Sequence, residues 1–107
     1  MEKLELYRTY KEDWDGYGGL PFSDKVIDNT KFVINSFHQQ PHISPTGRGS
    51  VQLSYRLEEK CIEVEISDNL EVEVLEIIGV VEREYSEQID QIANRIYDFF
   101  NSGSSIR

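Results

Sequence analysis

The chain has 107 residues, of which 20 are acidic and 11 are lysine or arginine, for a formal net charge of -9. This length gives one domain with one core, and the charge argues against direct binding of nucleic acid or anionic membranes. A single cysteine, a charged N-terminal stretch and the lack of an apolar run near the roughly 20 residues of a membrane span predict a cytoplasmic protein without disulfides.

Two helices are expected at the N-terminal end. Apolar residues at helical spacing predict the first over residues 2–13, and it must end at the glycine-rich "WDGYGGLPF", where Pro21 follows. Ser23 is a good N-cap for a second helix, which carries an apolar stripe and ends near His38. The segment "QQPHISPTGRGS" is predicted to be a loop that leads into strands.

Three strands are expected next, at residues 51–57, 62–66 and 70–74, because apolar and polar residues alternate in each. Matching apolar to apolar residues pairs Leu57 with Ile62 and Ile66 with Leu70. The first hairpin then turns at residues 59–60, and the second at residues 67–69, with Asn69 in the left-handed region.

The alternation breaks at Val74-Leu75, which predicts a bulge or bend. The following "EIIGVV" is either a short fourth strand or an extended apolar connection. Ser86 is predicted to cap a last helix. The expected fold is therefore α+β, with two N-terminal helices, a three- or four-stranded antiparallel meander and a C-terminal helix in one domain over residues 1–101. Residues 102–107 are expected to be a disordered tail.

The charge is unevenly distributed, because residues 58–98 hold thirteen acids against Lys60, Arg83 and Arg95. The predicted register places Glu65 opposite Glu71, Glu63 opposite Glu73, and Arg56 opposite Glu63. Like charges across a ladder are destabilising by about 0.2–1 kcal/mol per pair. Two interpretations remain open: a solubilising face that protects the sheet, or a surface that binds a basic patch on another protein.

A second candidate site combines the "WDGYGGLP" bend with the loop that contains Arg48. It consists of Trp14, Asp15, Tyr17 and Arg48, and glycine-rich loops that hold aromatic anchors often bind ligands. The alternative is a corner whose aromatic residues pack into the core. This site supports an alternative function, the binding of a small ligand or an anion.

"DWDGYGGLPFS", "SPTGRGSVQLSY" and "CIEVEISDN" together resemble a set of small, uncharacterised bacterial proteins. Those proteins carry a W-D-x-Y-G-A-x-P element before P-T-x-x-G-x-x-Q-L-x-W and L-E-I-E-I strands. The resemblance covers about residues 10 to 75; Gly19 replaces the usual alanine, and Tyr55 stands at the aromatic position. It implies the order of the elements and no activity.

Catalytic and metal-binding patterns are weak. His38 and His42 are separated by Pro41 and have no acidic residue near them in the sequence, so no metal site is expected. Glutamates around Cys61 would raise the pKa of its thiol, which argues against a nucleophile. The Arg48 loop lacks the G-K-[ST] of a phosphate-binding loop. We therefore predict no enzyme and no cofactor.

The leading prediction is a non-enzymatic acidic interaction module. By analogy with antitoxins, immunity proteins and anti-CRISPR or other anti-defence proteins, it would be a small inhibitor that blocks a basic, nucleic-acid-binding surface in a bacterial or phage conflict system. Its partner-binding residues would be Glu63, Glu65, Glu71, Glu73 and Arg56. A homodimer through Ile77, Ile78, Val80 and Val81 is a further alternative.

Overall fold

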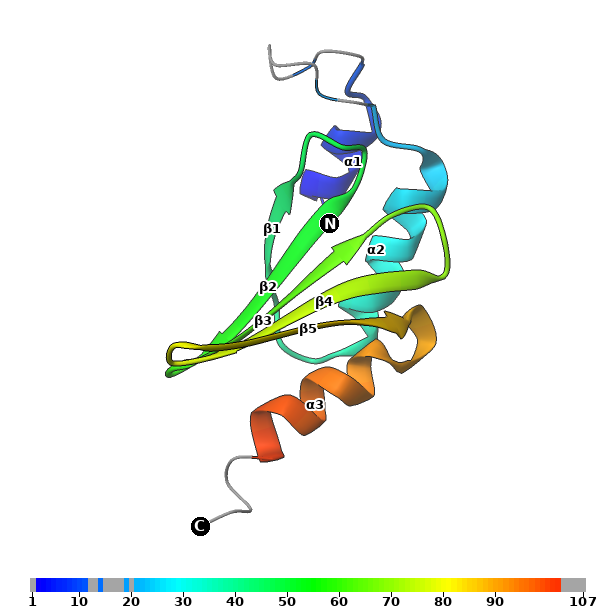
Figure 1. Ribbon diagram of the computed structural model, residues 1–107. Helices are drawn as coiled ribbons and strands as arrows, with labels where there is room; N and C mark the ends of the chain where they lie inside the picture. Colours follow the sequence, from blue (N-terminus) through cyan, green and yellow to red (C-terminus); the bar gives the residue numbers. More distant parts are fainter. Residues whose placement is uncertain (1, 12–13, 15–18, 20, 103–107) are drawn as a thin grey trace.

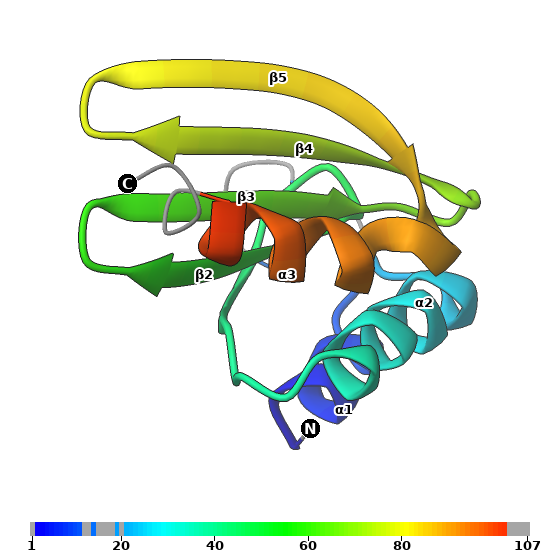
Figure 2. The same ribbon diagram turned by 90° about the horizontal axis from the view of Figure 1, so that it is seen from below.

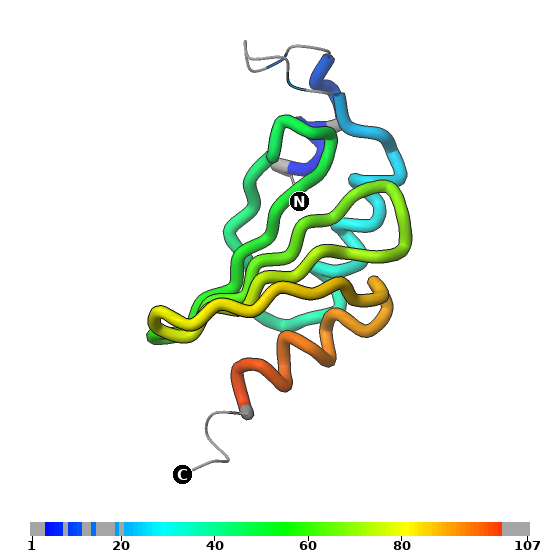
Figure 3. Tube along the Cα trace, in the orientation of Figure 1, coloured from blue at the N-terminus to red at the C-terminus, as the bar shows by residue number. Residues whose placement is uncertain are grey.

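Five antiparallel strands form one sheet, and helices cover one of its faces (Figure 1). The computed structural model describes residues 2–11, 14, 19 and 21–102. The elements in chain order are α1 (Glu2–Arg8), α2 (Asp24–Ser36), β1 (His42–Pro45), β2 (Val51–Leu57), β3 (Lys60–Ile66), β4 (Glu71–Ile78), β5 (Val81–Gln88), the 3-10 helix η1 (Ile89–Gln91) and α3 (Ile92–Ser102). The strands follow one another across the sheet in the order of the sequence, as the tube in Figure 3 shows.

The core lies between the sheet and the helices. Helix α3 runs along β3 on one face of the sheet and α2 lies beside α3, while α1 packs on α2 (Figure 2). Alternate residues of β2, β3 and β4 face these helices and are buried, namely Val51, Leu53, Tyr55, Ile62, Val64, Ile66, Val72 and Val74. Helix α2 forms as predicted: Ser23 Oγ accepts a hydrogen bond from the Val26 N–H at 3.2 Å, and the apolar stripe of the helix is buried.

Helix α1 is shorter than predicted. It ends at Arg8, where the Thr9 N–H and hydroxyl both donate to the carbonyl of Leu6, at 3.0 and 2.6 Å. The Tyr10 N–H likewise donates to the carbonyl three residues back, that of Tyr7, at 3.0 Å, so the chain closes with tighter turns after Arg8; Tyr10 also stacks on Trp14 with 4.9 Å between ring centroids. The predicted helix over residues 2–13 is therefore wrong beyond Arg8, and residues 12 and 13 lie outside the described part of the chain.

The sheet has five strands rather than three or four. Strand β1 lies within the predicted loop, and β5 lies where the C-terminal helix was expected to begin. Ser86 is a strand residue, whose hydroxyl donates to Glu73 Oε2 at 3.0 Å, and the helical turns begin only at Ile89. At the other end α3 includes Ser102, which was assigned to the tail.

Both predicted hairpin registers are wrong by two residues. Leu57 pairs with Lys60 rather than Ile62, so the first turn is Glu58-Glu59, with Glu58 at a φ of 56°. Ile66 does not pair with Leu70, because the second loop is wider and the Glu71 N–H donates to Asn69 Oδ1 at 2.9 Å. Among the non-glycine residues with described backbone, Glu58 alone has a positive φ, so the left-handed Asn69 was also wrong.

No bulge interrupts the sheet at Val74-Leu75. Val74 pairs with Val64 and Leu75 with Glu63, in continuous register. The change in sequence pattern instead reflects a change in what each face carries. Leu75 and Ile77 lie on the face away from the helices, and Glu76 lies on the helix side.

Candidate functional site

The face of the sheet away from the helices is the candidate site, and we call it the open face. Strand alternation places six glutamates on it: Glu63 and Glu65 of β3, Glu71 and Glu73 of β4, and Glu82 and Glu84 of β5. No helix of the described residues lies on this face (Figure 1). In an antiparallel sheet such a face is expected to be polar, but here β3, β4 and β5 place six side chains of the same charge on it.

A shallow hollow lies at the centre of the open face. It has a volume of about 340 Å³ and is lined by Gln52, Glu63, Glu65, Glu73, Val74, Leu75 and Glu84. The carboxylates come from three adjacent strands, and Leu75 contributes an apolar surface between them. The hollow is thus suited to a cationic side chain with an aliphatic stem.

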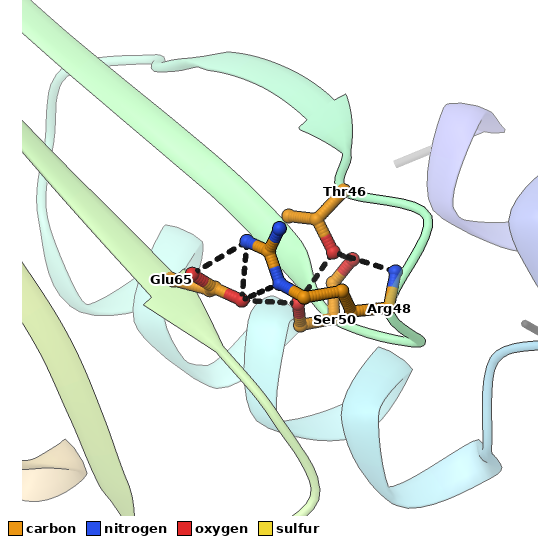
Figure 4. Close-up of polar contacts among 4 residues, drawn as sticks. All are labelled: Thr46, Arg48, Ser50 and Glu65. Atoms are coloured by element: carbon orange, nitrogen blue, oxygen red, sulfur yellow. Dashed lines mark hydrogen bonds and ion pairs between the residues drawn. The ribbon is translucent and has the colours of Figure 1, made fainter. Parts of the chain in front are cut away.

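Arg48 neutralises one carboxylate of the hollow, as Figure 4 shows. Its Nη2 lies 3.0 Å from both oxygens of Glu65, and its Nε lies 3.3 Å from Oε2. Ser50 Oγ donates to the same Oε2 at 2.6 Å, and Thr46 Oγ1 lies 2.6 Å from Ser50 Oγ. Residues of the loop between β1 and β2 therefore orient the Glu65 carboxylate, whose side chain is 30% exposed.

The other carboxylates of the hollow are not compensated in this way. Glu73 lies directly opposite Glu65 and accepts one hydrogen bond from the neutral Ser86. Glu63 lies opposite Leu75 rather than Glu73, and Arg56 lies opposite Cys61 rather than Glu63. The structure shows no ion pair between Arg56 and Glu63. Negative charge therefore remains at Glu63, Glu73 and Glu84 around the hollow.

The prediction that four glutamates share one face of the sheet is confirmed, and the predicted strand pairs are wrong. Glu63, Glu65, Glu71 and Glu73 share one face, as expected, although Glu65 opposes Glu73 instead of Glu71. Glu82 and Glu84 were missed, because the segment before Ser86 was not recognised as a full strand. Apolar and polar residues do not alternate in this segment, because Arg83 and Glu87 are charged like Glu82 and Glu84, so the sequence held no clear signal of a strand.

Of the second predicted site, the structure describes Trp14 and Arg48. Trp14 packs against Tyr10 and against Phe22, at 5.8 Å between ring centroids, which fits a core anchor. Arg48 instead lines a separate hollow of about 220 Å³ with Pro21, Ser23, Val26, Gly49, Ser67 and Asp68. Asp15 and Tyr17 lie outside the described residues. The Arg48–Glu65 ion pair weighs against an anion at this position.

A polar cluster on the helix side was not predicted. Tyr85 Oη donates to Glu76 Oε2 at 2.5 Å, and Arg83 and Arg95 lie over the Tyr85 ring, 5.2 and 5.3 Å from its centroid. Burial and the bond to Glu76 raise the pKa of Tyr85. Arg95 also binds Glu87, and this hydrogen bond lowers the pKa of the Glu87 carboxyl. The two arginines of this cluster balance the charges of its two glutamates, Glu76 and Glu87.

Three other side chains of types that act as nucleophiles or metal ligands are Cys61, His38 and His42. Cys61 is buried, and burial is the main cause that raises the pKa of its thiol. The charge of Arg56 lowers this pKa, and the charge of Glu63 raises it. His42 is exposed on β1, and His38 packs on Phe37 at 4.6 Å between ring centroids. The described residues contain no cluster of three or more acidic, histidine or cysteine groups that could hold a metal ion. None of the described helices is long and apolar enough to span a membrane.

The residues proposed for a dimer do not form one patch. Ile77 is half-buried on the open face, whereas Ile78, Val80 and Val81 are exposed around the β4–β5 turn. Val80 at the tip of this turn is 98% exposed.

Comparison with known proteins finds no matching family model, no similar curated protein and no similar solved structure.

Proposed function

We propose that the open face binds a basic surface of another protein and thereby blocks it. The observation that carries this proposal is the 340 Å³ hollow, around which Glu63, Glu73 and Glu84 remain without a basic partner among the described residues. Glu73 is the diagonal cross-strand neighbour of both Glu63 and Glu84, so these carboxylates repel one another, and their retention is explained if a cationic group binds there. Complementary charge also accelerates encounter and selects the partner.

The geometry suggests how a basic surface would be recognised. A lysine or arginine could lay its aliphatic stem on Leu75 and direct its charged end to the surrounding carboxylates. Arg48 fixes Glu65 within the hollow, and Glu63 and Glu84 lie on either side of Leu75. The partner class that fits is a nucleic-acid-binding protein, whose basic surface would be occluded by the acidic sheet. We extend this to a small inhibitor in a bacterial or phage conflict system.

The test compares two charge-reversal variants with the same change in net charge. The first combines Glu63→Lys, Glu73→Lys and Glu84→Lys on the open face. The control combines Glu59→Lys, Asp90→Lys and Asp98→Lys, which are exposed residues of a turn and of the C-terminal helical region. Basic proteins captured by the wild-type chain from bacterial lysate at low salt are identified, purified and measured for direct binding.

The open-face variant should lose binding, and the control variant should retain most of it. Binding of the wild-type chain should weaken as salt is raised, since exposed charges are screened. Adding the chain should also displace nucleic acid from the captured protein. Equal loss of binding in both variants would reduce the effect to net charge, and unchanged binding in the open-face variant would overturn the proposal.

A further inference from the structure

Strand β5 is a long, exposed edge of the sheet. It pairs only with β4 and has eight residues, of which Tyr85 and Glu87 alone are partly buried. In Figure 2 it forms the rim of the sheet, away from α3. The opposite edge, β1, has only four residues and ends in Pro45. Short strands and proline protect an edge from pairing, whereas β5 lacks both forms of protection.

The β4–β5 turn determines which backbone groups point outward. Gly79 and Val80 form a two-residue loop that closes on the pair Ile78 and Val81, and Gly79 has the positive φ, 61°, that such turns require. A two-residue loop closes on a hydrogen-bonded pair, and the pattern alternates along the ladder. The outward backbone groups of β5 therefore belong to Glu82, Glu84, Ser86 and Gln88.

We propose that two copies of the chain pair antiparallel through β5, with Tyr85 opposite Tyr85 at the two-fold axis. Outward groups must pair with outward groups, and this register matches Glu84 of one copy with Ser86 of the other, twice. Each of these pairs can exchange two backbone hydrogen bonds. Gln88 contributes less, because its N–H already donates to the Glu87 carboxylate at 3.1 Å.

Charge disfavours the two registers centred nearer the β4–β5 turn. A dimer centred on Glu84 would oppose Glu84 to Glu84, and one centred on Arg83 would oppose the two arginines. The register centred on Tyr85 instead opposes Arg83 to Glu87 on both sides of the axis and opposes no like charges. Arg83 is 67% exposed and so is accessible to a second chain. In that dimer Glu87 would bind Arg95 of its own chain and Arg83 of the other.

Pairing through β5 changes what the open face presents. Directly opposed residues of an antiparallel ladder point to the same side, so the open faces of both copies would form one continuous acidic surface. A partner with two basic patches could then engage both hollows at once. Of the apolar residues Ile77, Ile78, Val80 and Val81, Val81 alone lies on this edge.

The test begins with the mass of the full chain, measured by sedimentation and light scattering over a wide range of concentration. We expect a reversible dimer. Arg83→Glu should weaken it by about tenfold or more, since two favourable pairs become two like-charge pairs, whereas Arg83→Lys should retain it. Glu84→Pro removes an outward N–H without breaking the ladder to β4 and should abolish the dimer, whereas Glu84→Ala should not.

Cysteine cross-linking tests the register. The α-carbons of a non-hydrogen-bonded pair lie about 4.5 Å apart, within the range of a disulfide, so Tyr85→Cys should cross-link the copies under oxidation. Glu84→Cys is the control and should cross-link poorly. Circular dichroism checks that each variant is folded. A wild-type chain that is monomeric at all concentrations, a dimer insensitive to Arg83→Glu and Glu84→Pro, or cross-linking at residue 84 alone would each overturn the proposal.

Discussion

Tyr55 is the largest fully buried side chain, and its hydroxyl has no hydrogen-bond partner among the described residues. A buried polar group without a partner destabilises the fold, because it loses its bonds to water. Its ring still contributes to the core, where it meets Phe37 edge to face at 5.6 Å between centroids. The ring, rather than the hydroxyl, thus accounts for the stabilising role of this residue.

Tyr55→Phe should leave stability at neutral pH unchanged or raise it by up to about 1 kcal/mol. Burial raises the pKa of Tyr55 from its ordinary value of 10.0 to about 12. Because this pKa is higher in the folded chain, the associated stability is fully present below pH 10.0 and is lost as pH rises through about 12. The variant should therefore lose less stability over this window in urea unfolding.

The control for this prediction is Tyr97→Phe, since Tyr97 is 56% exposed. It should leave the alkaline part of the stability profile unchanged. A loss of several kcal/mol in Tyr55→Phe would instead mean that the hydroxyl has a stabilising partner, such as a bound water.

At the scale of the elements, the two hairpin turns place residues with positive φ in different ways. Gly79 adopts its φ of 61° without steric cost, but Glu58 adopts a φ of 56° with a β-carbon. Glu58→Gly should therefore stabilise the β2–β3 hairpin by about 0.5–1 kcal/mol in urea unfolding. Glu59→Gly is the matched control and should not stabilise the chain. Equal effects of both changes would count against strain at Glu58.

The sequence predicted which face each residue occupies better than it predicted the pairing of the strands. Alternation fixes the face, but a shift of two residues leaves the same residues buried, so Leu57 can pair with Ile62 or Lys60 without exposing the core. The loops decide between these registers, through the backbone at Glu58 and the bond from Glu71 to Asn69. Apolar alternation carries no information about either.

Strand β5 was missed for a different physical reason. As an edge strand it is exposed on much of both faces, so its residues do not alternate between apolar and polar as those of β3 do. Ser86 followed by acidic residues is also the usual pattern of a helix start. Consequently the part of the candidate site on β2 to β4 could be predicted, and the part on β5 could not.

At the scale of the whole molecule, the clustered negative charge lowers the stability of the fold and, in our proposal, allows a basic partner to bind. Glu73→Gln removes the direct opposition to Glu65 and keeps an acceptor for Ser86, so it should raise stability at low salt by about 0.2–1 kcal/mol. The gain should disappear near about 1 M salt, where exposed charges are screened. Asp98→Asn is the control, because Asp98 is exposed on α3, and it should give no comparable gain in stability.

This prediction would be wrong if the Glu73→Gln variant were less stable than the wild-type chain at low salt. That result would mean that the opposed carboxylates are already compensated in solution, and it would remove the argument from stability for a basic partner. The binding experiment would then stand alone.

The strands follow one another in chain order, and residues of the open face alternate with residues of the core along them. Among the described residues, the strand side chains of the open face come from residues 42–88 at every second position, while the intervening positions of β2, β3 and β4 hold core residues. New specificities could therefore be selected from a library that varies only these alternate codons. The sheet would serve as a scaffold on which a binding surface is rewritten while its buried half is preserved.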